Sequence, residues 1–315
     1  MLAANRARAA RFVALLGNLA VLTGLVGATW ASAEPRMSVV AGSGGVPLLV
    51  AEEGKPNAPG ILFLHGFAQS HLSFSRQFES DLARRYHLVA FDLRGHGGSG
   101  KPWDDASYAD ARTWADDVAA VIKATGLRRP IIVGWSFGGF VAIDYLRIHG
   151  TRNIAGLSLV GSLGGLTAAP AMSAGDNPRA RQVKARSDRQ RALDLAANIA
   201  SNQETAAGYV TPNMTAADRE ILIATEMMMP AYARRAMRAR NLDNRDMATR
   251  LDLPVLLTRG SSDVTMPSAD TNLLLARLPR ARLSDYPGAG HLAFVEQPDR
   301  FNRELAAFAV TAKAR

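Results

Sequence analysis

Short apolar runs separated by turn residues make up much of the chain beyond residue 37. Three of them, Ile61–Leu64, His87–Phe91 and Ile131–Gly134, are unbroken rather than alternating. Unbroken runs of this length are typical of strands covered on both faces in a parallel sheet. The helix-like stretches between these runs are Phe74–Arg85 and Tyr108–Thr125. This alternation predicts an α/β fold with a mostly parallel, doubly wound sheet.

The second half of the chain continues the alternation around a long stretch of different character. Ile154–Val160 and Pro254–Arg259 are further strand candidates, and Gly161–Leu251 between them is rich in Ala, Arg and Met. Because strand-like segments resume after it, this stretch is predicted to be a helical insertion rather than a separate domain. The last elements are a strand at Ala281–Tyr286 and a helix at Pro298–Thr311. The predicted division is a sheet core, residues 37–160 and 252–315, and an insertion, residues 161–251.

Residues 1–33 have the three parts of a secretory signal peptide. Three arginines lie among the first eleven residues, no charge occurs from Phe12 to Trp30, and Ala31-Ser32-Ala33 forms a small-x-small cleavage site. We expect cleavage here and export of the body to the periplasm or out of the cell. The apolar run is also near the length of a membrane span. A retained N-terminal anchor is therefore the first alternative, and a cytoplasmic amphipathic helix is the second.

The composition excludes several classes of protein. The chain of 315 residues is 48% hydrophobic and contains no Cys, which excludes intrinsic disorder, a disulfide scaffold, an iron–sulfur protein and a cysteine nucleophile. The net charge falls from +9 to +6 when Arg6, Arg8 and Arg11 of the predicted signal are removed. The remaining basic residues are scattered along the chain, so nucleic-acid binding is disfavoured.

The segment Gly134-Trp135-Ser136-Phe137-Gly138 matches the G-x-S-x-G pattern of a nucleophile elbow. It follows a strand-like run and opens a helix-like one. A serine on such a tight strand-to-helix turn is held with its hydroxyl exposed, and the flanking glycines let the turn close. The start of the helix also supplies backbone N–H groups where an oxyanion would form. Ser136 is therefore the predicted nucleophile.

A serine nucleophile needs a base, and the base needs an acid that orients it. His291 follows the last predicted strand on a glycine-rich turn and is the predicted base. Asp263 follows the preceding strand and is the predicted acid, with Asp285 as a weaker competitor because it lies within a strand. Ser136, Asp263 and His291 all come just after predicted strands, at the edge where α/β sheets place their sites.

With these motifs the sequence resembles the α/β-hydrolase superfamily over about residues 37–311. His65-Gly66-Phe67 resembles the oxyanion loop of that family, and Asp92–Ser99 resembles its D-x-R-G-x-G-x-S turn. The similarity is greatest to the branch of small hydrolases described as non-haem haloperoxidase-like or proline-iminopeptidase-like. The resemblance implies an α/β-hydrolase fold, a structural role for His65, and a cap formed by residues 161–251. It also implies that the backbone N–H groups of Phe67 and Phe137 hold the oxyanion.

Two other patterns have weaker functional interpretations. Gly95–Gly100 satisfies G-x-G-x-x-G, with Asp116 and Asp117 further on, but Lys101-Pro102 follows at once and no helix opens for a pyrophosphate. Methionines at positions 227–229, 237 and 247 either line an adaptable apolar pocket or pack the insertion. No spacing of His, Asp or Glu suggests a metal, and we expect no cofactor.

These features predict a serine hydrolase that cleaves a carboxylic ester or lactone through an acyl-enzyme on Ser136. The alternatives are a perhydrolase or haloperoxidase-like enzyme, in which peroxide attacks the same acyl-enzyme, and a ligand receptor on a hydrolase fold. Epoxide or haloalkane opening is disfavoured by the same resemblance, because the family members with those activities need a carboxylate where Ser136 stands. Aminopeptidase activity is disfavoured because the insertion lacks a plain acidic cluster, although Glu204, Asp218 and Glu226 are available. The expected partner is a small ester-type molecule, and the oligomeric state stays open.

Overall fold

Eight strands form one sheet in the order β1-β2-β4-β3-β5-β6-β7-β8. The computed structural model describes residues 34–167, 178–209, 211–237 and 240–313, so the predicted signal segment lies outside the described residues. β2 is antiparallel to both β1 and β4, and every other neighbouring pair is parallel, which confirms the predicted mostly parallel sheet. The strands are β1 (Arg36–Ala41), β2 (Pro47–Glu53), β3 (Gly60–Leu64), β4 (His87–Phe91), β5 (Ile131–Trp135), β6 (Gly156–Val160), β7 (Val255–Gly260) and β8 (Ala281–Tyr286).

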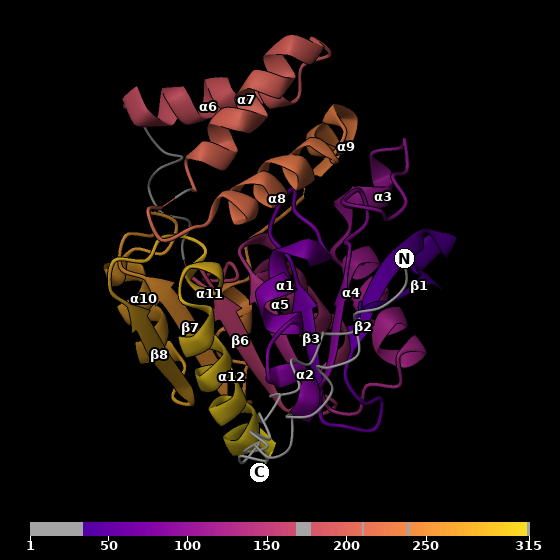
Figure 1. The fold of residues 1–315 in the computed structure, drawn as a ribbon, viewed down its shortest axis with the longest axis vertical. Helices are drawn as coiled ribbons and strands as arrows, with labels where there is room; N and C mark the ends of the chain where they lie inside the picture. Colours follow the sequence, from indigo (N-terminus) through magenta and orange to yellow (C-terminus); the bar gives the residue numbers. More distant parts are fainter. Residues whose placement is uncertain (1–33, 168–177, 210, 238–239, 314–315) are drawn as a thin grey trace, which may run out of the picture. The chain divides into compact units, whose positions relative to one another are not determined.

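Helices cover both faces of the sheet, as Figure 1 shows, and this explains why the central strands read as unbroken apolar runs. Along β3, Ile61 and Phe63 pack on the side of α1, α2 and α12, whereas Leu62 and Leu64 pack on the side of α4 and α5. Alternate residues of one strand thus enter two separate cores. The helices of the sheet core are α1 (Ser75–Phe78), α2 (Leu82–Arg85), α3 (Ala106–Ala109), α4 (Ala111–Ala124), α5 (Phe137–His149), α10 (Ser268–Arg277), α11 (Ala293–Glu296) and α12 (Pro298–Lys313).

Two helices that the sequence predicts as continuous are split, and both corrections have a local cause. The stretch Phe74–Arg85 contains the short helices α1 and α2, and the hydroxyl of Ser80 hydrogen-bonds to the backbone on both sides of the turn between them. The stretch Tyr108–Thr125 is interrupted at Asp110, whose backbone is extended and whose carboxylate accepts a hydrogen bond from the N–H of Arg112 at 2.8 Å. Such side chains compete with the helical backbone and favour a new helix start.

Residues 161–251, called the insert below, lie between β6 and β7, and the part of them that the structure describes is largely helical. In Figure 1 these helices lie beyond the carboxyl ends of the parallel strands. Their bounds are α6 (Pro178–Gln190), α7 (Leu195–Ala207), α8 (Ala216–Met227), α9 (Ala231–Ala236) and η5 (Arg245–Met247). The insert therefore stands at the edge of the sheet where the predicted site residues gather.

Charged side chains attach the insert to the sheet core. Arg76 of α1 and Asp218 of α8 form an ion pair at 3.1 Å. Arg240 forms a buried ion pair with Asp144 of α5, and its guanidinium lies 4.9 Å from the ring centroid of Trp114. Burial lowers the pKa of Arg240 to about 9. Removing one partner of the buried pair would leave an uncompensated charge, so loss of Arg240 or Asp144 alone should be costly to the folded state.

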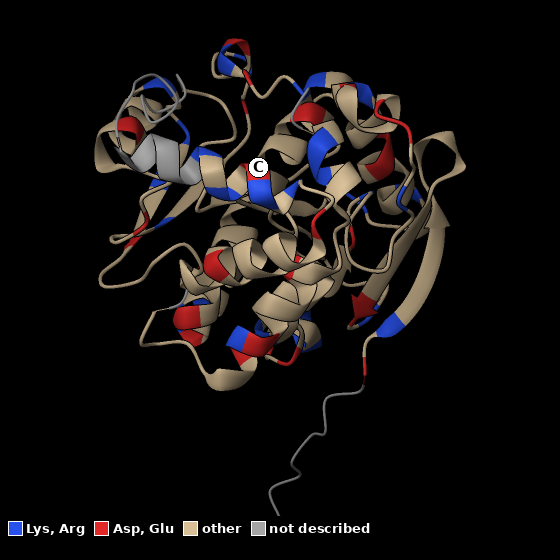
Figure 2. Ribbon diagram, turned by 90° about the horizontal axis from the view of Figure 1, so that it is seen from above, with Lys and Arg blue, Asp and Glu red and all other residues tan. Residues whose placement is uncertain are grey.

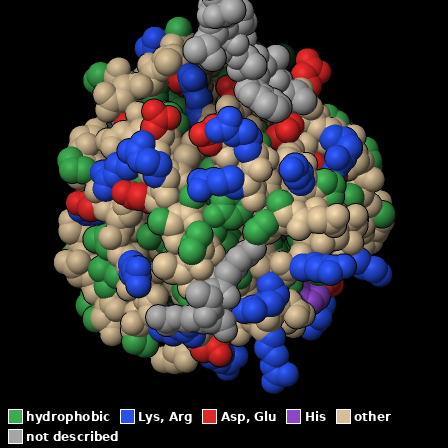
Figure 3. Space-filling model, turned by 60° about the horizontal axis from the view of Figure 1, so that its bottom comes forward, with side chains coloured by type: hydrophobic (Ala, Val, Ile, Leu, Met, Phe, Trp, Pro, Cys, Tyr) green, Lys and Arg blue, Asp and Glu red, His purple; other side chains and the backbone are tan. Residues whose placement is uncertain are grey.

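The charged surface agrees with the scattered pattern expected from the sequence. Seen from above in Figure 2, Lys and Arg lie beside Asp and Glu, and the insert contains the pairs Lys184–Asp188 and Arg189–Glu204. In the view of Figure 3, with the bottom of the molecule brought forward, Lys and Arg are spread among apolar side chains rather than gathered in one patch. In the part of the chain that the structure describes, no helix is long and apolar enough to span a membrane.

Candidate active site

Ser136 lies at the turn between β5 and α5 in a strained backbone conformation, with φ 51° and ψ −115°. The glycines beside it are required by space. A Cβ on Gly134 would lie 2.7 Å from the carbonyl oxygen of Gly138, and a Cβ on Gly138 would lie 2.1 Å from the carbonyl oxygen of Leu64. The backbone N–H of Ser136 donates to Val160 at 3.0 Å, which ties the turn to β6. The predicted elbow is thus held by its neighbours in a conformation that non-glycine residues rarely adopt.

Asp263 and His291 are brought together by the turns after β7 and β8. Oδ2 of Asp263 lies 2.9 Å from Nδ1 of His291, and both side chains are buried. The other carboxylate oxygen of Asp263 accepts hydrogen bonds from the backbone N–H and the hydroxyl of Thr265, at 2.8 and 2.7 Å. Burial alone would raise the pKa of Asp263, but the hydrogen bonds from His291 and Thr265 hold it below its usual value. The carboxylate is therefore kept ionised beside the ring.

The rest of the His291 turn is fixed by contacts to both the core and the insert. The indole N–H of Trp135 donates to the carbonyl oxygen of His291 at 3.1 Å, so the turn lies directly beside the elbow. Tyr209 of the insert stacks on the imidazole, with ring centroids 5.1 Å apart. Within the described residues, the hydroxyl of Ser136 makes no hydrogen bond to the ring. The structure thus joins Asp263 to His291 and leaves Ser136 on the adjacent turn.

The turn after β3 runs alongside the elbow. A Cβ on Gly66 would lie 3.3 Å from the Cβ of Ser136, and the rings of Phe67 and Phe137 meet edge-on with centroids 5.9 Å apart. His65 lies beneath this turn: its Nδ1 is 2.8 Å from the carbonyl oxygen of Gly66, and its Nε2 accepts from a backbone N–H at 2.9 Å. Burial lowers the pKa of His65 to about 4. A neutral His65 with both nitrogens occupied braces the turn.

The glycine-rich turn after β4 lacks the features of a nucleotide-binding loop. No helix opens at Gly95–Gly100, and α3 begins only at Ala106. Asp117, the acid that a nucleotide site would need, receives two hydrogen bonds of 2.7 Å from the guanidinium of Arg94. Both side chains are buried. This arrangement disfavours a nucleotide-binding interpretation, and among the described residues no group of three or more His, Asp or Glu could hold a metal ion.

Three acids of the insert could by sequence hold a substrate ammonium group, and in the structure each of them is paired. Glu204 pairs with Arg189, Asp218 with Arg76, and Glu226 with Arg234. Glu226 is buried, which raises its pKa, although Arg234 and Gln69 oppose that shift. Each acid thus faces an arginine, which leaves none of them free to bind a substrate ammonium group. Of the methionines singled out in the sequence, Met229, Met237 and Met247 are buried in the core, and Met228 is exposed.

Three side chains near the site were missed by sequence reasoning. Thr265 lies two residues after Asp263, and that spacing, typical of a side-chain–backbone turn, was a local signal that could have found it. Tyr209 and Gln69 have no such signal. Tyr209 reaches His291 from the insert, and Gln69 follows Phe67 and contacts α8. Only the folded arrangement brings these residues to the site.

Comparison with known proteins agrees with this architecture. A family model described as alpha/beta hydrolase fold matches residues 59–298. A bifunctional esterase/perhydrolase of Acinetobacter calcoaceticus is 25% identical over 280 residues, covering 86% of this chain and 99% of that protein. A non-heme chloroperoxidase of Streptomyces lividans is 28% identical over 287 residues, with coverages of 86% and 99%. The crystal structure of esterase RhEst1 from Rhodococcus sp. ECU1013 superposes with a TM-score of 0.76 at 28% identity, covering 88% of this chain and 99% of that one.

Proposed function

The chain belongs to the α/β-hydrolase family, and on that premise we propose that it cleaves carboxylic esters or lactones through an acyl-enzyme on Ser136. The observation that carries this proposal is the 2.9 Å contact between Asp263 and His291, on turns that adjoin the strained Ser136. Esterases and perhydrolases among the similar proteins support the same class of chemistry.

Acylation begins at the Ser136 hydroxyl. Nδ1 of His291 is occupied by Asp263, which leaves Nε2 as the proton acceptor. As the Ser136 oxygen attacks the carbonyl carbon, its proton passes to Nε2, and the negative charge develops on the carbonyl oxygen. The backbone N–H groups of Phe67 and Phe137 donate to that oxygen. The imidazolium then protonates the leaving alcohol, and the acyl group stays on Ser136.

Deacylation repeats these steps with water in place of the serine. Nε2 of His291 takes a proton from water while the water oxygen attacks the acyl carbon. Collapse of the second tetrahedral intermediate breaks the bond to Ser136, and the proton returns to the serine oxygen. The carboxylic acid is released, and the ionised Asp263 stabilises the imidazolium in both halves of the cycle.

The decisive experiment compares Ser136→Ala with Ser162→Ala. Ser162 is a second hydroxyl beside the elbow, and it donates to the carbonyl oxygen of Ser136 at 2.8 Å. We expect the Ser136 variant to lose hydrolysis of short p-nitrophenyl esters and labelling by a fluorophosphonate, and the Ser162 variant to keep both. Unchanged turnover in Ser136→Ala would refute the assignment of the nucleophile.

The insert is proposed to act as a cap that selects the substrate. Glu204, Asp218 and Glu226 are each paired with an arginine, which supports a neutral ester or lactone of small or medium size over a substrate with an ammonium group. An ester series of increasing acyl length, assayed beside an aminoacyl p-nitroanilide, tests this selection. Faster cleavage of the anilide than of every ester would contradict it.

Perhydrolysis is the second candidate, because two similar proteins are a perhydrolase and a chloroperoxidase. In that reaction peroxide replaces water as the acceptor of the acyl group and a peracid forms. Measuring peracid from acetate and peroxide alongside ester hydrolysis separates the two. If the parent protein forms no more peracid than Ser136→Ala does, perhydrolysis is refuted and hydrolysis remains as the proposed reaction.

Export of the protein is proposed from residues 1–33 alone. Fractionation of cells that express the full chain tests it. Recovery of the full-length protein in the cytosol would contradict both a cleaved signal and a membrane anchor.

A further inference from the structure

The turn that carries Phe67 is joined to the insert by one buried amide side chain. Oε1 of Gln69 accepts from the hydroxyl of Thr225 at 2.7 Å, and Nε2 donates to a carboxylate oxygen of Glu226 at 3.1 Å and to the carbonyl oxygen of Leu222 at 3.4 Å. Gln69 is 2% exposed. All three partners belong to α8, more than 150 positions further along the chain. A buried amide with this set of partners specifies one arrangement of the two segments.

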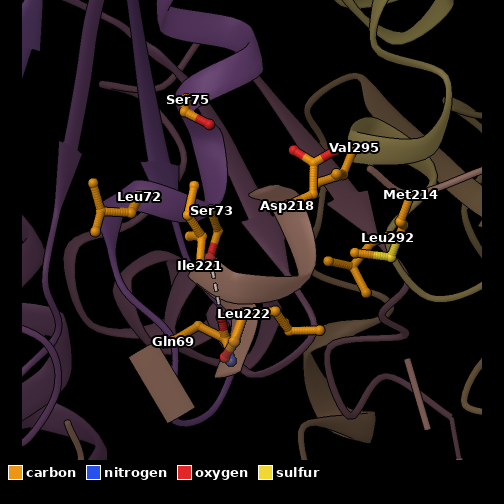
Figure 4. Close-up of a pocket in the computed structure, with 10 residues that line it drawn as sticks. All are labelled: Gln69, Leu72, Ser73, Ser75, Met214, Asp218, Ile221, Leu222, Leu292 and Val295. Carbon is orange, nitrogen blue, oxygen red and sulfur yellow. Dashed lines mark hydrogen bonds between the residues drawn. The ribbon is translucent and has the colours of Figure 1, made fainter. Parts of the chain in front are cut away.

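Figure 4 shows the region where Gln69 meets α8, which is called the seam below. Gln69 and Ser73 line a narrow cleft together with Ile221 and Leu222 of α8. Ser73 also donates to Oε1 of Gln69, at 3.5 Å, and this is the dashed line of the figure. Leu292, the neighbour of His291, also lines this cleft. The seam therefore touches both turns that flank Ser136.

The backbone between Phe67 and Gln69 is under strain. Ala68 has φ 58°, and in the described part of the chain only Arg129 and Ser136 share a positive φ among non-glycine residues. A residue keeps such a conformation when its surroundings over-determine it. Within the turn, the N–H of Gln69 bonds to the carbonyl oxygen of Gly66 at 3.2 Å. The Gln69 side chain, one residue beyond the strained position, adds the contacts to α8.

We propose that Gln69 is a positioning residue, which aims the backbone N–H of Phe67 at the developing oxyanion by anchoring its turn to α8 of the insert. The inference rests on the proposed acyl transfer at Ser136. It assigns the insert a role in the chemical step besides covering the substrate. The oxyanion donor is in place only while α8 is seated on the core.

A second glutamine, Gln190, provides a control that distinguishes this role from a general effect on the buried Glu226. Gln190 of α6 also donates to that carboxylate, at 3.4 Å, and to Thr205 at 2.7 Å, but it does not contact the Phe67 turn. Both Gln69 and Gln190 are buried. Replacing either by Met keeps the length of the side chain and removes a donor to Glu226, and only Gln69→Met releases the turn.

We expect Gln69→Met to lower kcat for a p-nitrophenyl ester about 10- to 100-fold, with KM changed less than about threefold, because the displaced donor acts only in the transition state. Affinity for a boronic acid that forms a tetrahedral adduct on serine should fall by a similar factor. Gln190→Met should stay within about threefold of the parent in kcat. Thr225→Val, which removes one donor to Gln69, should lower kcat less, and adding it to Gln69→Met should change kcat little further.

Three outcomes would overturn the proposal: a raised KM at unchanged kcat in Gln69→Met, an equal loss in Gln190→Met, or unchanged boronic acid affinity. If Gln69→Met does not fold, as judged by circular dichroism and thermal unfolding, then Thr225→Val decides, and parental kcat there overturns the proposal. Failure of the proposed function is distinct, because it would appear as retained turnover in Ser136→Ala whatever the result at Gln69.

Discussion

Removing the side chain of Ser136 altogether should stabilise the protein while abolishing its activity. The backbone of this residue, at φ 51° and ψ −115°, lies outside the regions that residues with a Cβ prefer. Ser136→Ala keeps the Cβ and therefore the strain, whereas Ser136→Gly removes both. The backbone hydrogen bonds of the turn, to Val160, Gly139 and Ser162, do not use the serine hydroxyl and persist in both variants.

The size of the effect follows from two opposing terms. Relief of backbone strain of this kind stabilises the folded Ser136→Gly variant by about 1–3 kcal/mol. The greater freedom of glycine in the unfolded chain opposes this gain by about 0.4–1 kcal/mol. Ser136→Gly should therefore unfold with a free energy roughly 0.5–2 kcal/mol higher than Ser136→Ala, and with a Tm higher by about 1–5 °C. Both variants should lose about 10⁴-fold or more in kcat, since each lacks the nucleophile.

Urea unfolding followed by circular dichroism, with thermal scans at one fixed rate, measures the difference between the two variants. Equal slopes against urea would show that both unfold from comparable states. A Ser136→Gly variant no more stable than Ser136→Ala would refute the claim that the elbow stores strain. Activity retained by either variant would refute the role of the hydroxyl instead.

The remaining predictions concern the base, its acid and the buried imidazole below them. Asp263→Asn should lower kcat by about 10²–10⁴-fold with little change in Tm, whereas Asp285→Asn should keep parental kinetics; equal losses would reassign the acid. Tyr209→Ala should lower kcat about 2- to 10-fold by removing the ring stacked on His291, and Tyr209→Phe should not, so equal losses in kcat would point to the hydroxyl. His65 is neutral when folded, with a pKa of about 4, and takes up a proton near pH 6.5 when unfolded. Its contribution to the free energy of unfolding is therefore complete above pH 6.5 and falls by about 3 kcal/mol as the pH drops to 4. A His65→Gln variant should lose this part of the pH dependence when unfolding by urea is measured across the same range. An unchanged pH profile in that variant would contradict the prediction.

Local pattern was enough to predict the sheet and the positions of the three candidate catalytic residues. The runs at Ile61–Leu64 and Ile131–Gly134 are buried on both faces, which leaves no polar alternation to confuse them with edge strands. Ser136, Asp263 and His291 each lie on the turn that follows a strand, so their placement needed only the order of strands and turns. The helix breaks at Ser80 and Asp110 were not predicted, since apolar spacing continues across both and the side chain decides locally.

Contacts between distant segments could not be predicted in the same way. Gln69 meets Thr225 across 156 positions, and Tyr209 meets His291 across the junction between insert and core. A glutamine in a turn and a tyrosine after a helix are ordinary surface residues by sequence. Their burial depends on how α7 and α8 settle on the core, which depends on many side chains at once. The contacts between the insert and the candidate site are therefore visible only in three dimensions.

The attachment of the insert to neighbouring strands has a consequence for how this enzyme can change its specificity. β6 and β7, which precede and follow the insert, are hydrogen-bonded partners in the sheet, so the core closes whatever the length of chain between them. Lengthening such a connection costs little, about 0.6 kcal/mol for each doubling of a flexible loop. A transplanted insert would leave the fold intact, yet under the role proposed for Gln69 one that offers this side chain no partner would turn over substrate about 10- to 100-fold more slowly.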